Sequence, residues 1–145
     1  MLRLISWEQR WSLENLVEQH PGTLGPSLLR QLEGGRGVTL ETFRQDLALR
    51  DLARQRLAAL AGHCDALISP ASCGPAPRFD ATRDTPYPTG DVSFSCVSSY
   101  LGAPAVAAPL LSVDGMPFGV QFIGQPHADE RVTAIARWTA QAATA

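Results

Sequence analysis

The sequence predicts a fold of both helices and strands, and three observations support this. Segments near each end of the chain carry apolar residues at every third or fourth position, which is the period of an amphipathic helix. Short apolar runs between them are bounded by proline or by an Asp-Gly pair, which is typical of strands. The chain has 145 residues, of which 45% are hydrophobic, enough for one packed domain.

The N-terminal region is expected to be helical. Apolar residues recur at spacings of three and four from Leu2 to about His20, and the proline- and glycine-rich segment 21–26 then ends the pattern. A short helix is expected at Ser27–Leu32. The run Gly34–Gly37 predicts a turn after it.

The longest helical pattern extends from Thr39 to Ala61, with Thr39 as N-cap and Gly62 as the stop. One of its faces carries charges of both signs, which predicts a solvated surface rather than a binding stripe. These charged residues are Arg44, Asp46, Arg50, Asp51, Arg54 and Arg56.

Three apolar runs predict strands. The first is 65–70, which ends at a proline and is followed by a proline-rich stretch, 71–90, expected to be a loop. The others are 105–111 and 117–123. The pair Asp114-Gly115 between them favours a tight turn, so these two strands should be adjacent and antiparallel, with at least one inside a covered sheet.

Two further helices are expected in the C-terminal half. A short one is predicted within Val92–Leu101, and a longer one from Asp129 to about Ala143 closes the chain. Asp129 and Glu130 suit the start of that helix, because its dipole favours negative charge there.

Charge and composition exclude several classes of function. The formal net charge is -2 without a basic stripe, which argues against nucleic acid and anionic membranes as partners. No run of 18 apolar residues and no charged-then-apolar leader is found, so we expect no spanning helix, no secretory signal and a cytoplasmic location. All 12 basic residues are arginine, so no mechanism that needs lysine can run on this chain.

Cofactor and metal sites are not predicted. The glycine-containing segments 74–77 and 102–104 lack the spacing of a phosphate-binding loop, and the lysine of a Walker loop is missing. The odd set Cys64, Cys73 and Cys96 matches neither a zinc site nor a disulfide scaffold. We expect these thiols to be reduced and mostly buried.

Histidines and the residues beside them are weak catalytic candidates. His63, Cys64 and Asp65 combine a base, a nucleophile and an acid, but neighbours in sequence rarely point at one another as a triad requires. For His20, His63 and His127 we expect surface or capping roles, because none has a convergent partner in the sequence.

The richest hydroxyl cluster comprises Ser95, Ser98 and Ser99, just before the segment Gly102–Pro104. A serine nucleophile needs a base, and the chain offers neither a lysine nor a G-x-S-x-G elbow. We therefore expect a structural role for all three serines.

The order and spacing of three segments resemble the C-terminal part of the amidase signature family. These are Asp65–Pro70, Gly102–Pro109 and Gly115–Gly124, with an arginine-rich helix before them and an Asp-Glu-headed helix after them. Each segment alone is a weak signal, but the ordered set is specific. The family usually has an asparagine three residues before the glycine of the Gly-x-Pro turn, where this chain has Ser99.

The resemblance implies an α/β fold with a mixed β-sheet flanked by helices, and amide hydrolysis or amide transfer by a serine nucleophile. The family uses that serine, a second serine in a cis peptide and a lysine, all in a portion that nothing in this chain matches. No catalytic residue is therefore carried over. Gly102 and Pro104 would shape the turn into a strand, Asp114-Gly115 a hairpin, and Gln121 would be buried with its amide in need of partners.

These observations lead to one expectation and two alternatives. Residues 1–145 form a single partial amidase domain, helical over 1–62, with the strand, loop and sheet region at 63–145; alone it is not competent for catalysis and takes an amide substrate only with the missing N-terminal part. The first alternative is a non-catalytic module that associates through exposed strand edges. The second is an independent hydrolase that uses Cys96 or Ser99 with a histidine.

Overall fold

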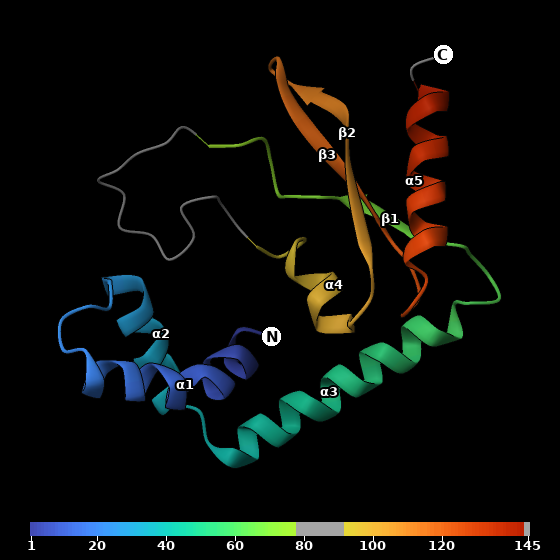
Figure 1. Cartoon of the computed structure of the whole chain (residues 1–145). Coiled ribbons are helices and arrows are strands. Elements are labelled where there is room, and N and C mark those ends of the chain that lie inside the picture. Colours follow the sequence, from blue (N-terminus) through green and yellow to red (C-terminus); the bar gives the residue numbers. More distant parts are fainter. Residues whose placement is uncertain (78–91, 144–145) are drawn as a thin grey trace. The chain divides into compact units, whose positions relative to one another are not determined.

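The computed structural model describes residues 1–77 and 92–143 (Figure 1). Its contacts divide the chain into two compact units, Met1–Leu52 and Ala53–Ala145. The elements in chain order are α1 (Leu2–Gln19), α2 (Pro26–Arg36), α3 (Leu40–Ala59), β1 (Leu67–Pro70), α4 (Cys96–Leu101), β2 (Ala105–Val113), β3 (Met116–Ile123) and α5 (Asp129–Ala143).

In the first unit, α1 packs against α2. The helix predicted at Ser27–Leu32 is confirmed as part of α2, but the turn predicted at 34–37 is wrong, because α2 continues through both glycines to Arg36. Gly35 is buried, and a Cβ there would lie 2.3 Å from the backbone oxygen of Ser6. Gly35 therefore allows close approach of the two helices rather than a turn.

Aromatic residues join α1 to the start of α3. The Trp7 ring stacks on Phe43 with centroids 5.2 Å apart and meets Trp11 edge to face at 5.4 Å. The guanidinium of Arg10 lies over both indole rings, 3.7 Å from the Trp7 centroid and 4.0 Å from the Trp11 centroid. The cation and the rings attract one another in this arrangement.

The prediction that the charged face of α3 is solvated is wrong at Asp46. Its side chain is buried, and Arg3 donates hydrogen bonds to both carboxylate oxygens, at 2.8 Å from Nε and 2.5 Å from Nη2. The rest of that face is exposed only in part, because Arg50 and Arg54 are half-buried. The partner of Asp46 is 43 positions away in sequence, so a prediction based on helical period could not identify it.

This ion pair predicts a specific acid sensitivity. Hydrogen bonds from Arg3 lower the pKa of Asp46 in the folded chain, so the pair stabilises the fold at pH values above the unfolded pKa of about 3.9. That stability is lost as the pH falls through the lower, folded pKa. We expect the free energy of unfolding to drop below about pH 4 in the wild type.

Urea titrations of Asp46→Asn across that range provide the test, and the variant should show a smaller drop. Asp51→Asn is the matched control, because Asp51 is exposed on the same helix. An acid drop as large in Asp46→Asn as in the wild type, or a drop reduced equally in Asp51→Asn, would contradict this assignment.

The predicted N-cap of α3 is confirmed, since the backbone N–H of Thr42 donates to Thr39 Oγ1 at 3.1 Å. The helix ends at Ala59, two residues before the predicted end, and the chain then turns through Gly62. The 65–70 strand is also shorter than predicted, because β1 begins at Leu67.

The second unit contains a three-stranded sheet in the order β1-β3-β2, with both pairings antiparallel. The predicted hairpin is confirmed: β2 and β3 are joined by Asp114 and Gly115, with φ values of 51° and 76°. Two successive positive φ values are those of a type I′ turn, which follows the twist of the flanking strands.

Helix α5 packs on β2 and β3 and forms the core with them. Phe122 of β3 is completely buried, and Val132 and Ala136 of α5 complete the cluster. These two positions are one turn apart on one face of the helix, as the apolar period predicts. The predicted helix 129–143 is confirmed in both bounds.

Two other expectations meet the structure as follows. The predicted loop 71–90 forms neither helix nor strand over 71–77, and its remainder lies outside the described residues. The helix expected within 92–101 is confirmed but begins only at Cys96. Across the described ranges, no helix combines the length and the apolar character needed to cross a bilayer.

Candidate functional site

The best-defined polar site of the second unit is centred on Gln121 in the middle strand. Its side chain is 5% exposed, and it stands opposite Ser69 on β1 and Ala107 on β2. The amide nitrogen Nε2 donates to Ser69 Oγ at 2.9 Å and to the backbone oxygen of Phe94 at 3.1 Å. The prediction that Gln121 is buried and needs partners for its amide is confirmed.

Chemistry fixes the orientation of this amide. The carbonyl oxygen of Phe94 can only accept, so the NH₂ group of Gln121 must face it. The Ser69 hydroxyl donates to Pro70 O at 3.1 Å, which leaves its lone pairs for the second N–H of Gln121. Both amide protons are therefore used, which makes the group a structural connector and not an acid or base.

The hydroxyl and thiol cluster lies around the start of α4. Ser95 Oγ donates to Val92 O at 3.2 Å, and Cys96 Sγ donates to Ser93 O at 3.7 Å. Ser99 is exposed. In the part of the chain that the structure describes, no hydrogen bond joins these groups to a histidine, so the arrangement has no base for a nucleophile.

Gly102 ends α4 in the left-handed conformation, with φ of 68°, as expected for the residue that shapes the turn into the next strand. A Cβ there would lie 3.1 Å from Nη2 of Arg54, so the guanidinium rests against this turn. Pro104 O then accepts the N–H of Gly124 at 3.0 Å. Sequence reasoning missed Arg54 here because its partner is a backbone turn and not a charged residue.

The three candidates His63, Cys64 and Asp65 do not form a catalytic group. The Cys64 thiol donates to the backbone oxygen of Leu60 at 3.8 Å, while the Asp65 carboxylate forms an ion pair with Arg131. His63 is exposed at the turn after α3.

The remaining histidines lie on the surface, as predicted. His20 is exposed and caps the C-terminus of α1, with its backbone N–H donating to Leu16 O at 2.9 Å. His127 is exposed two residues before α5 and has a φ of 65°.

The cysteines differ from the prediction in their burial. Cys73 is exposed, and Cys64 and Cys96 are only half-buried, so the expectation of mostly buried thiols is wrong. No disulfide joins the three. Over residues 1–77 and 92–143 no group of three or more His, Cys, Asp or Glu side chains has the arrangement needed to hold a metal ion.

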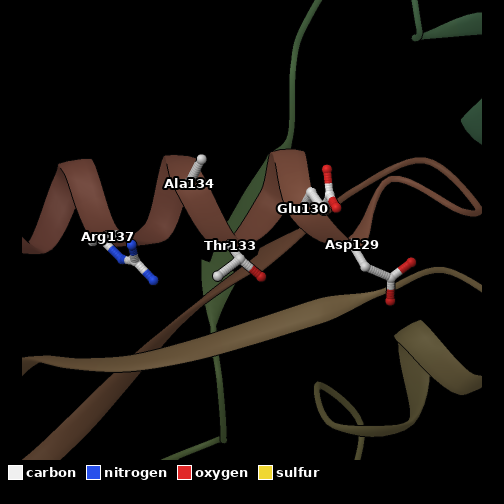
Figure 2. Close-up of a pocket in the computed structure, with 5 residues that line it drawn as sticks. All are labelled: Asp129, Glu130, Thr133, Ala134 and Arg137. Atoms are coloured by element: carbon white, nitrogen blue, oxygen red, sulfur yellow. The ribbon is translucent and has the colours of Figure 1, made fainter.

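A shallow pocket lies on α5 (Figure 2). Its lining residues come from successive turns of this one helix and are Asp129, Glu130, Thr133, Ala134 and Arg137. Acidic residues in a first turn are the ordinary complement of the helix dipole. The two acidic residues therefore have a structural explanation, and among the described residues no side-chain hydrogen bond or ion pair joins the lining residues into a catalytic group.

Comparison with known proteins decides the family. A family model described as Amidase matches residues 8–133, which is most of the chain. The chain belongs to the amidase family. One relative is a subunit of glutamyl-tRNA(Gln) amidotransferase from Symbiobacterium thermophilum, which is 38% identical over 82 residues, covering 55% of this chain and 16% of that protein.

Solved amidase structures share the fold. A crystal structure of an amidase matches 95% of this chain and 33% of its own, with 27% identity and a TM-score of 0.79. A bacterial aryl acylamidase of the amidase signature family matches 92% of this chain and 31% of its own, with 18% identity and a TM-score of 0.69. The chain thus spans about a third of the solved amidases it matches.

The family assignment from three sequence segments and the predicted α/β fold class are therefore correct. In the amidase fold of this chain, the first segment contains β1, the second leads from the α4 cap into β2, and the third contains β3. All pairings among the described strands are antiparallel. That the chain is a single partial domain, helical over 1–62 and with the sheet region at 63–145, stays a prediction.

Proposed function

We propose that this chain is the carboxy-terminal third of an amidase and does not hydrolyse amides by itself. Its role is to supply the hairpin, the α5 cover and part of the substrate-pocket wall. The observation that carries the proposal is the match of 95% of this chain to only 33% of an amidase structure. A chain that corresponds to one third of an enzyme supplies only the helices and strands of that third.

The residues of the chain support the same proposal. The family resemblance implies a serine nucleophile, a second serine and a lysine that relays protons, but lysine is absent from the entire sequence. Within the described ranges, the Ser95 hydroxyl and the Cys96 thiol donate to backbone oxygens and have no base beside them. In the whole enzyme an acyl-enzyme forms on a serine outside this chain, with backbone N–H groups stabilising the oxyanion.

A direct assay tests whether the chain is inactive alone. We expect the purified chain to release 4-nitroaniline from 4-nitroacetanilide at the buffer rate. Cys96→Ala and Ser99→Ala serve as matched variants, because these residues would carry an independent hydrolase. Turnover above buffer that either substitution abolishes would overturn the proposal in favour of that hydrolase.

Self-association is the second candidate, and it is favoured by exposed apolar side chains. Ile68 on β1 is 63% exposed, Leu111 on β2 is 52% exposed and Trp138 on α5 is 69% exposed. Strands β1 and β2 are the outer strands of the sheet, and unpaired edges invite association. Pro70 and Pro109 on these strands lack an N–H and so weaken edge pairing.

Light scattering after gel filtration distinguishes the two roles. A monomer mass across a hundredfold range of chain concentration favours the amidase fragment. A mass that rises with concentration and returns to that of a monomer in Ile68→Ser favours the association module.

A further inference from the structure

Gln121 connects three segments that are distant in sequence. Its own strand, β3, is the central strand; Ser69 belongs to the outer strand β1; and Phe94 lies just before α4. One amide group therefore bonds both β1 and a residue that lies two positions before α4.

The packing around Gln121 suits this task. The opposite residue on β2 is Ala107, whose small side chain leaves room on that side of the row. Burial of Gln121 to 5% exposure means that water cannot easily replace either bond. Loss of the donor would leave the Phe94 oxygen with the long bond from the Val97 N–H, at 3.4 Å, and a buried hydrogen bond costs more to lose than an exposed one.

We propose that Gln121 is a positioning residue whose amide holds the segment entering α4 against the sheet. We call the two hydrogen bonds of this amide, to Ser69 and Phe94, the clasp. This inference rests on the proposed function in one respect, because the described segment that enters α4 is taken as part of the proposed substrate-pocket wall. With the clasp in place, the segment that enters α4 has a fixed position relative to β1 and β3.

Hydrogen exchange of the full chain tests the clasp directly. In Gln121→Met, which keeps the length but has no donor, we expect amides in 94–101 to exchange roughly tenfold faster than in the wild type at every pH. In Gln121→Glu the carboxylate faces the Phe94 oxygen, and we expect the same acceleration at pH 8. Burial raises the pKa of such a carboxyl, so its protonated form should regain one donor and recover protection at pH 5, relative to wild type at that pH.

Gln125→Met is the matched control. Gln125 follows β3, and its Nε2 donates to Leu57 O of α3 at 2.8 Å. The same chemical change there should speed exchange near Leu57 and leave 94–101 unchanged. Wild-type protection of 94–101 in Gln121→Met, or equal acceleration of that segment in both methionine variants, would overturn the proposal. If Gln121→Glu does not fold, the methionine pair still decides.

An enzymatic readout separates positioning from mere stability. In a chimera that joins this chain to the catalytic portion of an amidase, Gln121→Met should raise KM about tenfold with little change in kcat, because substrate binding and not the reacting groups is disturbed. A fall in kcat at constant KM would contradict positioning of the wall. Hydrogen exchange is measured on the chain alone and tests the clasp by itself. An inactive chimera would therefore count against the proposed function and not against the clasp.

Discussion

Gly35→Ala should destabilise the first unit by about 3 kcal/mol. The added methyl would lie 2.3 Å from the Ser6 oxygen and 3.1 Å from Arg10 Cβ, and the nearest of these atoms is backbone that cannot rotate away. Helices α1 and α2 would have to separate, which loosens their shared contacts. Alanine favours an exposed helix by about 1 kcal/mol over glycine, but here the overlap outweighs that gain.

Gly34 offers a matched control one residue earlier in the same helix. A methyl group there meets no atom within 4 Å, so Gly34→Ala should stabilise the unit by about 0.5–1 kcal/mol. Urea unfolding followed by tryptophan fluorescence measures both, in a Trp138→Phe background that leaves only the indoles of α1. Equal effects of the two substitutions would show that α1 and α2 do not meet at Gly35.

Phe122→Ala should cost about 3–5 kcal/mol in the second unit. The ring is fully buried between the sheet and α5, where it contacts the cluster of Val132 and Ala136. Removing it leaves a cavity that a hairpin and one helix cannot refill without moving. The measurement is urea unfolding followed by circular dichroism.

Ile68→Ala is the control for this prediction. Ile68 is directly opposite Phe122 in the register of β1 and β3, yet it is 63% exposed. Its truncation should change the free energy of unfolding by about 0.5 kcal/mol or less. A similar cost for both residues would mean that the strand order or the packing of α5 differs from the one described.

Local patterns were sufficient for much of the fold. The turn at Asp114-Gly115, the cap at Thr39 and the bounds of α5 each depend on residues close together in sequence, and each is confirmed. A tight turn, a helix cap and a helical period are short-range features.

The wrong predictions concern features that are set by contacts between residues distant in sequence. Two adjacent glycines favour a turn locally, but the approach of α1 makes Gly35 a helix residue. Asp46 has the pattern of a solvated charge until Arg3 folds onto it. Tertiary contacts override local preference in both cases.

In the candidate site, too, features set by local sequence were predictable and features set by distant contacts were not. Burial of Gln121 follows from its place in an apolar strand, so the need for partners was predictable. Identifying Ser69 requires the register of β1 against β3, and identifying Phe94 requires the tertiary contact between β3 and the residues before α4. Neither is encoded in spacing along the chain.

The central proposal is that this chain is a structural third of an amidase and does not hydrolyse amides by itself. The most direct test replaces the matching carboxy-terminal third of a solved amidase with this chain and measures release of 4-nitroaniline from 4-nitroacetanilide. We expect hydrolysis by the chimera and none by this chain or by the shortened amidase alone. A chimera that is folded and monodisperse but inactive, or turnover by the isolated chain, would contradict the claim.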